Sequence, residues 1–109
     1  MAYNELLAQR VRGHMESLPG FIEKKMFGGV GFMLFGNIAC GVNKDDLIVR
    51  VGPAGYDDAL SQPNVRVFDL TGRPMKGWVV VTAGGYESDQ ELWSWIEKGI
   101  AFARSLPVK

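Results

Sequence analysis

The first eighteen residues carry apolar side chains at the spacing of an α-helix. Four of them recur at intervals of three or four, namely Leu7, Val11, Met15 and Leu18. Charged residues occupy the positions between them, as on the solvated side of a surface helix. Asn4 is a suitable N-cap, and Pro19 with Gly20 stops the pattern. The pattern predicts an amphipathic helix at the start of the chain.

Between residues 21 and 51 the helical spacing is replaced by short apolar or alternating runs, separated by turns that contain glycine. Such runs are typical of an antiparallel meander. We predict four strands, at residues 22–27, 31–35, 38–42 and 47–51. Gly36 and Asn37 both tolerate positive φ, so we expect them to form a two-residue hairpin turn. Residues 43–46 are expected to form the next turn.

The second half of the chain predicts helix, strand, strand and helix. Pro53 suits a first helical turn, and a short helix is expected through Tyr56 and Leu60. Residues 65–70 and 78–82 are rich in β-formers and are joined by the loop 71–77.

A capping box predicts the start of the last helix, because Ser88 and Glu91 can satisfy backbone donors in its first turn. An apolar stripe follows that includes Trp95 and Ile96, whereas Trp93 falls outside the stripe. The whole order lacks regular βα alternation. We therefore predict one α+β domain over residues 1–109, with an antiparallel sheet of about six strands and helices packed on it in two layers.

Composition narrows the function classes. Twelve Lys and Arg residues balance twelve Asp and Glu residues, so we expect no autonomous binding to nucleic acid. The apolar runs are too short to cross a membrane, and the N-terminal residues lack the pattern of a secretory signal. Cys40 is the single cysteine and cannot form an internal disulfide. We expect a cytoplasmic protein that makes no contact with a membrane.

Four blocks of sequence resemble the N-terminal domain of the TfoX/Sxy family. The blocks are residues 25–33 (KMFGGVGFM), 37–42 (NIACGV), 47–52 (LIVRVG) and 68–78 (FDLTGRPMKGW). They stand in the family's order and at similar spacing, and the resemblance covers nearly the whole chain. It implies a fold similar to that of the secretion chaperones, with helices on an antiparallel sheet.

The resemblance also implies a regulatory role. The family's namesakes are bacterial regulators of natural competence that work with the cyclic-AMP receptor protein and carry a second, C-terminal helical domain. We expect this chain to be a stand-alone version of the N-terminal domain. The family supplies no catalytic residue set that can be transferred to this sequence.

Few residues offer chemistry of their own. Cys40 and His14 are the only candidates for a nucleophile and a base, but Cys40 lies in an apolar strand, as a buried structural cysteine does. Ligands at metal-binding spacing are missing, and we expect no metal and no cofactor. The glycine run 28–31 leads into a strand and lacks the ending of a phosphate loop, so a turn or a close backbone approach is expected there. The acidic pairs 45–46 and 57–58 are expected to be structural.

The loop 71–77 is the strongest candidate for recognition. Arg73 and Lys76 flank Pro74 and Met75, and Trp78 follows directly, so the loop combines cations with a stiff and partly apolar tip. The alternative is an ordinary turn whose cations are solvated or paired with Asp69. Arg50, on a neighbouring predicted strand, extends the cationic patch if its side chain points outward.

These features favour a non-enzymatic protein-interaction module. We expect a homodimer formed through an exposed sheet face or edge, with Trp93 as a possible interface residue. A transcription regulator or another protein is the expected further partner. The alternative is a sensor of small molecules or anions that uses Arg50, Arg73 and Lys76. A small hydrolase or transferase is least favoured, because no set of nucleophile, base and orienting group can be assembled.

Overall fold

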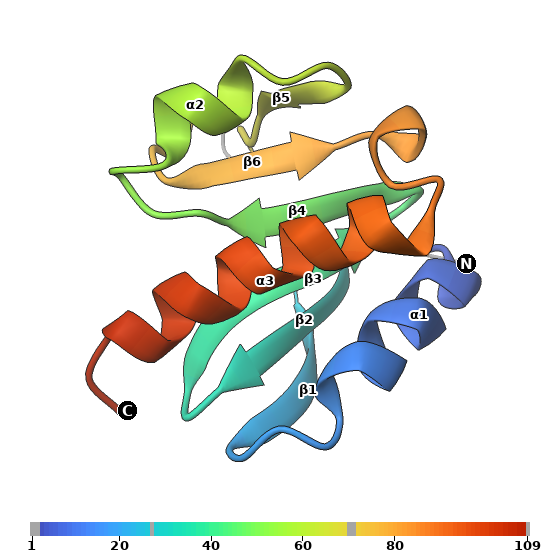
Figure 1. Ribbon diagram of the computed structural model, residues 1–109, viewed down its shortest axis with the longest axis vertical. Helices are drawn as coiled ribbons and strands as arrows, with labels where there is room; N and C mark the ends of the chain where they lie inside the picture. Colours follow the sequence, from blue (N-terminus) through green and yellow to red (C-terminus); the bar gives the residue numbers. More distant parts are fainter. Residues whose placement is uncertain (1–2, 27, 70–71, 109) are drawn as a thin grey trace.

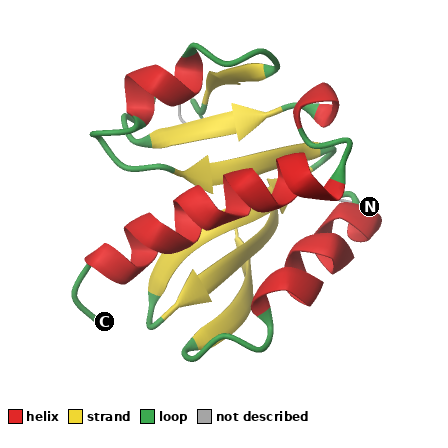
Figure 2. Ribbon diagram, in the orientation of Figure 1, coloured by secondary structure: helices red, strands yellow, loops and turns green. Residues whose placement is uncertain are grey.

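A six-stranded antiparallel sheet covered on one side by three helices forms the domain (Figures 1 and 2). The computed structural model describes residues 3–26, 28–69 and 72–108. The elements are α1 (Glu5–Met15), β1 (Phe21–Met26), β2 (Gly29–Leu34), β3 (Asn37–Asn43), β4 (Asp46–Arg50), α2 (Tyr56–Leu60), β5 (Val65–Val67), β6 (Trp78–Val81), the short 3-10 helix η1 (Ala83–Gly85) and α3 (Asp89–Ser105). The predicted α+β class and the order of helices and strands are confirmed.

The strands are arranged in the order β1-β2-β3-β4-β6-β5. The first four form the predicted meander, and all neighbours run antiparallel. After β4 the chain passes through α2 and returns so that β5 lies outside β6. β1 and β5 are therefore the two edges of the sheet.

All three helices lie on the same face of the sheet, which we call the inner face. Figure 1 shows α3 crossing the sheet diagonally with α1 beside it. Gly99 brings α3 very close to β3, because a Cβ at this position would lie 2.2 Å from the carbonyl oxygen of Ala39. A residue without a side chain is needed at this crossing.

The helix ends follow the capping signals in the sequence. The Asn4 side chain accepts a hydrogen bond from the Leu7 amide at 3.0 Å. At α3 the Ser88 hydroxyl accepts from the Glu91 amide at 3.0 Å, and the Glu91 carboxylate accepts from the Ser88 amide at 3.1 Å. Both predicted caps are thus confirmed, and each satisfies backbone donors that the first helical turn leaves unpaired.

Two ion pairs fasten α1 to its neighbours. Arg12 binds both carboxylate oxygens of Glu23 on β1, at 2.6 and 2.8 Å. This hydrogen-bonded pairing lowers the pKa of Glu23. Arg10 reaches Asp89 at the start of α3, at 3.1 Å. Both pairs are partly open to solvent, so they orient α1 more than they stabilise it.

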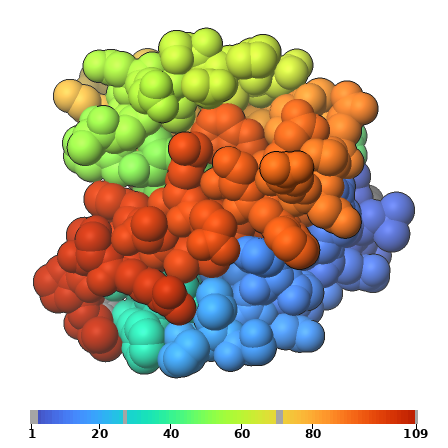
Figure 3. Space-filling view, viewed as in Figure 1, coloured from blue at the N-terminus to red at the C-terminus, as the bar shows by residue number. Residues whose placement is uncertain are grey.

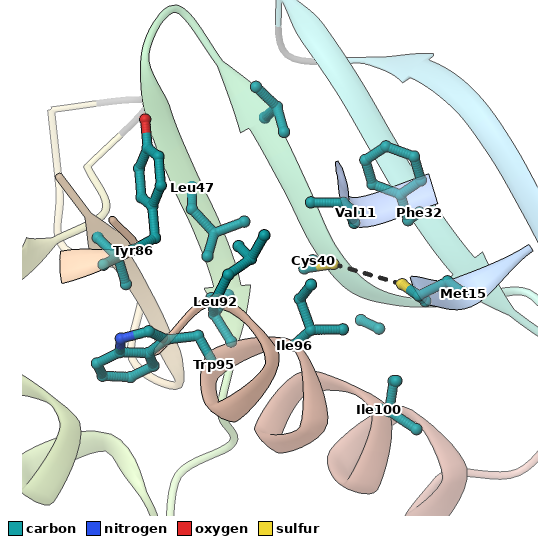
Figure 4. Close-up of a cluster of buried hydrophobic side chains, with 14 of the residues drawn as sticks. Val11, Met15, Phe32, Cys40, Leu47, Tyr86, Leu92, Trp95, Ile96 and Ile100 are labelled. Atoms are coloured by element: carbon teal, nitrogen blue, oxygen red, sulfur yellow. Dashed lines mark hydrogen bonds between the residues drawn. The ribbon is translucent and has the colours of Figure 1, made fainter. Parts of the chain in front are cut away.

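The core lies between the helices and the inner face (Figure 4). Its largest fully buried side chains are Leu7, Val11, Met15, Val30, Phe32, Leu34, Val42, Leu47, Val49, Leu92 and Ile96. Ile48 is also fully buried, but on the other face of the sheet. Trp95 is also buried, with 8% of its surface exposed. The apolar faces that the sequence predicts for the first and last helices contribute the helical side chains of this core.

The structure corrects several predicted boundaries. The first helix ends at Met15, not near Leu18. The turn between β2 and β3 has Phe35 and Gly36 at its centre, with φ of 52° and 85°, whereas Asn37 is buried in β3. The predicted Gly36-Asn37 turn was therefore wrong by one residue. The Phe35 ring covers Gly20, where a Cβ would lie 2.7 Å from the ring, and this packing accounts for a non-glycine residue in the left-handed region.

The strand predicted at residues 65–70 is shorter than expected. β5 ends at Val67, and Phe68 turns away to pack with Ile48 and Val80 on the side of the sheet opposite the helices, which we call the outer face. Residue 70 lies outside the described residues, as does residue 27 at the end of the first predicted strand. η1 was not predicted at all.

Candidate functional site

The loop that follows β5 folds over the outer face of the sheet. Within its described part, residues 72–77, the Met75 amide donates to the Phe68 carbonyl at 2.9 Å. The Trp78 amide donates to the Met75 carbonyl at 3.0 Å. The side chains of Met75 and Trp78 pack against a small cluster of Ile48, Phe68 and Val80. The base of the loop is therefore built into the sheet.

A second set of hydrogen bonds fixes the end of this loop. The Gly77 carbonyl accepts from the amides of Val51 at 2.8 Å and Gly52 at 3.0 Å. Gly77 has a φ of +95°, and a Cβ there would lie 3.3 Å from the Gly52 carbonyl carbon. Glycine is favoured at Gly77 because few other residues adopt this φ. The loop therefore leaves the sheet along a fixed path.

Arg50 belongs to the base of the loop more than to its tip. It lies directly opposite Trp78 in the pairing of β4 with β6. The centre of its guanidinium is 5.3 Å from the Trp78 ring centroid and 5.2 Å from that of Phe102 on α3. These cation–π contacts join both strands to the helix. Arg50 is half-buried, so its charge is only partly accessible to a ligand.

Arg73, Pro74 and Lys76 are exposed at the tip of the loop. Among the described residues neither Arg73 nor Lys76 forms an ion pair, and the alternative pairing with Asp69 does not occur there. Asp69 instead contributes its carbonyl, which accepts from the Gly72 amide at 2.9 Å. Residues 70 and 71 lie outside the described residues. The tip therefore carries two exposed cations.

A patch of apolar side chains lies on the outer face at the β1 edge, and sequence reasoning missed it as a set. We call Ile22, Met33, Phe35 and Ile38 the outer patch. Ile22 pairs with Met33, and Met33 pairs with Ile38, so the three form one row across three strands. Ile22 is 54% exposed and Phe35 is 42% exposed. Each residue is apolar in the sequence, but only the register shows that Ile22, Met33 and Ile38 share a face, and Phe35 follows in the turn after β2.

Trp93 bridges two helices while remaining half-exposed. Its ring stacks on the imidazole of His14 with 4.9 Å between centroids, which connects α3 to α1. The His14 Nε2 atom lies 2.9 Å from a carboxylate oxygen of Glu97. Half of the Trp93 surface is exposed, so part of the ring can still contact another molecule.

Cys40 and His14 do not form a nucleophile and base pair. Cys40 is fully buried, and its Sγ atom lies 3.7 Å from Sδ of Met15 (Figure 4). Burial raises the pKa of the Cys40 thiol to about 12. The thiol is therefore protonated at neutral pH and out of reach of a substrate. His14 makes its contacts with Trp93 and Glu97 instead.

The glycine run and the acidic pairs have structural contacts. Gly28 turns the chain with a φ of +75°, and a Cβ on Gly29 would lie 2.0 Å from the Val42 carbonyl oxygen. This is the close backbone approach predicted for the run. Asp46 pairs with Arg66 at 2.8 Å. The pair 57–58 lies in the first turn of α2.

The part of the chain that the structure describes lacks two structural features, a metal-ligand cluster and a membrane-spanning helix. No group of three or more His, Cys, Asp or Glu side chains there is placed to hold a metal ion. None of the described helices has the length and apolar character that crossing a bilayer requires.

The geometry defines a small α+β domain with a closed inner face and an open outer face. A sequence model described as the TfoX N-terminal domain matches residues 14–103. The match covers most of the 109 residues, and the chain belongs to the TfoX N-terminal domain family. The resemblance noted in its glycine-rich blocks is thus confirmed. No curated protein and no solved structure gives a significant match.

Proposed function

We propose that this domain is a non-enzymatic interaction module that pairs with a second copy of itself through the β1 edge and the outer patch. The observation that carries the proposal is the outer patch, in which Ile22 is 54% and Phe35 is 42% exposed while Met33 and Ile38 are partly exposed beside them. Contiguous exposed apolar surface marks interaction sites in soluble domains. The buried, protonated Cys40 supports a non-enzymatic role, and a free thiol is typical of a protein kept in the reducing cytoplasm.

The sequence of β1 is complementary to itself. In an antiparallel pairing centred on Lys24, Glu23 of each copy faces Lys25 of the other, and Ile22 faces Met26. Opposite charges and apolar pairs at directly opposed positions both stabilise a sheet. The two Lys24 side chains at the two-fold axis are exposed and can separate into solvent. Such a pairing continues the sheet across two copies and places their outer patches side by side.

The mass in solution at several protein concentrations tests the pairing. The wild-type chain should sediment at about twice the monomer mass of 12.0 kDa at micromolar concentration. Ile22→Lys should return it to the monomer mass, because it removes the apolar pair of Ile22 with Met26 and adds a positive charge beside the two Lys24 side chains at the two-fold axis. Leu6→Lys is the matched control, since Leu6 is 72% exposed on α1 and away from the outer patch. A wild-type chain that remains monomeric at every concentration would contradict the proposal.

A second role is supported by the tip of the loop. Arg73 and Lys76 are exposed and make no ion pair within the described residues, beside a proline that stiffens the chain. We propose that this tip binds an acidic surface of a partner protein, for which a transcription regulator is our first expectation. The alternative ligand is a small anion. It would be bound by Arg73 and Lys76 together with Arg50, and Trp78 and Met75 would lie beside it at the base of the loop.

Two measurements separate these ligands. Partners captured from the native cell by the wild-type domain should be lost when Arg73 and Lys76 are both replaced by alanine. Arg104→Ala, an exposed change on α3, should leave capture intact. If nucleotides or sugar phosphates raise the melting temperature of the wild-type domain and not of the double variant, the loop is an anion sensor. Equal capture by both proteins, with no anion effect, would exclude the tip from recognition.

A further inference from the structure

Arg50 differs from the other half-buried arginines of the domain in having no carboxylate partner. Arg12 binds Glu23 through two hydrogen bonds. Arg10 pairs with Asp89. Arg50 is half-buried as they are, yet it forms no ion pair with any residue that the structure describes. Partial burial removes some of the water around a cation, and a carboxylate normally compensates for that loss. At Arg50 this compensation has to come from water or from a ligand.

Two aromatic rings hold the Arg50 guanidinium at the end of β4. Its central carbon lies 5.3 Å from the ring centroid of Trp78 on β6 and 5.2 Å from that of Phe102 on α3. The Phe102 ring is itself fixed, because it lies over Gly52, where a Cβ would be 2.4 Å from a ring carbon. Figure 3 shows this part of α3 packed against the segment that follows β4. The cation is therefore held in place before a ligand arrives.

The rings leave the N–H groups of the guanidinium without an acceptor. An aromatic face attracts a cation but offers no ordinary hydrogen-bond acceptor. Within the described residues, arginine side chains donate hydrogen bonds from Arg10, Arg12 and Arg66 and not from Arg50. The Arg50 nitrogens are also not among the buried atoms that lack a partner, so they remain open to solvent. A guanidinium presents its donors in one plane, as a fork that matches the two oxygens of a carboxylate.

The neighbourhood of Arg50 favours an acidic protein over a nucleic acid. The Gly77 carbonyl accepts hydrogen bonds from the two amides that follow Arg50, so the loop that carries Arg73 and Lys76 ends beside it. These three cations attract a local negative charge. The chain as a whole has no net charge, which disfavours a phosphate backbone that carries a charge on every nucleotide. A carboxylate of an acidic protein segment fits this balance.

We propose that Arg50 selects a carboxylate in the acidic partner by binding one Asp or Glu side chain through two of its N–H groups. This inference rests on the second role proposed above, in which the tip of the loop binds an acidic surface. The two sets of cations then contribute differently. Salt screens the attraction of the exposed Arg73 and Lys76, whereas the contact of the half-buried Arg50 is screened less and requires the planar fork of an arginine.

The probe that tests the site is a hexaglutamate peptide with blocked ends, titrated into the wild-type domain and followed by proton–nitrogen NMR. The indole signal of Trp78, identified by its loss in Trp78→Phe, should shift in a saturable manner at peptide concentrations up to about 10 mM. Hexathymidylate, a short single-stranded DNA, should bind at least about tenfold more weakly. Tighter binding of the DNA than of the peptide would overturn the proposal and make phosphate the ligand.

A pair of matched variants isolates the fork. Arg50→Lys keeps the charge but removes the planar donors, so it should weaken hexaglutamate binding by about tenfold or more. Arg104→Lys makes the same change at an exposed position of α3 and should leave binding unchanged. Phe102→Leu keeps the guanidinium but removes one of its two rings, and should weaken binding by about two- to fivefold. It takes the place of Arg50→Lys if that variant does not give the dispersed amide spectrum of a folded domain.

The inference and the role on which it rests fail by different results. Equal binding by the wild type and by folded Arg50→Lys, or unchanged binding by Phe102→Leu, would overturn the selection by Arg50 and leave the role of the tip intact. Equal binding by the wild type and by the double alanine variant of Arg73 and Lys76 would instead exclude the tip. If both roles hold, the affinity that remains in the double variant should depend less on salt than that of the wild type.

Discussion

The two faces of the sheet differ in how completely the chain covers them. On the inner face, Phe32 of β2 and Ile96 of α3 are fully buried. The helix α3 lies so close to the sheet that a Cβ at Gly99 would have no room. On the outer face, Phe68 and its neighbours cover only the β4 and β6 region, and Ile22 remains 54% exposed. An antiparallel sheet can leave one face open to solvent. The inner face therefore holds the fold, and part of the outer face stays open to solvent.

This division predicts that equal changes on the two faces have unequal effects. Ile96→Ala removes a fully buried side chain of α3 and should lower the free energy of unfolding by about 2 to 5 kcal/mol. Ile22→Ala on the outer face should lower it by less than about 1 kcal/mol in the monomer. Denaturant unfolding of both variants checks the difference. Similar losses at both sites would mean that the outer patch is part of the core.

A smaller difference is expected between two helical glycines. Gly99→Ala places a Cβ 2.2 Å from the Ala39 carbonyl oxygen, so α3 must move away from the sheet, at a cost of about 1 to 3 kcal/mol. At Gly13 in α1, no atom lies within 4 Å of the position that a Cβ would occupy, so Gly13→Ala should stabilise the domain by up to about 1 kcal/mol. Thermal unfolding should move the two variants in opposite directions. Stabilisation by Gly99→Ala would contradict the close contact of α3 with β3.

Sequence reasoning succeeds where the signal is local. The caps at Asn4 and Ser88, the apolar stripe through Ile96 and the order of the elements depend on neighbours within a few residues. The turn at Phe35 was misplaced, because the packing of its ring on Gly20 is a tertiary contact. Local patterns therefore predict elements better than they predict the turns that join them.

The candidate sites were harder to predict than the fold, because each depends on contacts between distant segments. The outer patch follows from the register of β1 with β2 and β3, which no local pattern fixes. On the helix side, Gln62 lines one depression together with Trp95 and Lys98, although the sequence offers no sign of that approach. The sequence left open whether the Arg50 side chain points outward, and the contact of its guanidinium with Phe102 of α3 could not be seen from local patterns.

The buried thiol gives the inner face a dependence on pH. Cys40 has an ordinary pKa near 9.0 when unfolded and about 12 when folded, so the unfolded chain loses its proton first as pH rises. The free energy of unfolding should therefore fall as pH increases from about 9 towards about 12. In Cys40→Ala the free energy of unfolding should fall less steeply over that range. The difference between the two proteins gives the contribution of the thiol apart from that of Tyr86, whose pKa is also raised. Parallel pH profiles for the two proteins would show that Cys40 is not buried.

The smallest effect on stability is expected at the tip of the loop. Arg73 and Lys76 are exposed and make no ion pair among the described residues, so replacing each by alanine should change the free energy of unfolding by no more than about 0.5 kcal/mol. The base of the loop is different, because Met75 and Trp78 pack over Ile48 and Val80. Met75→Ala should therefore destabilise the domain more than the double change at the tip. If the double variant melts several degrees lower than wild type yet captures the same partners, Arg73 and Lys76 stabilise the fold. The loop tip would then not be the site that binds those partners.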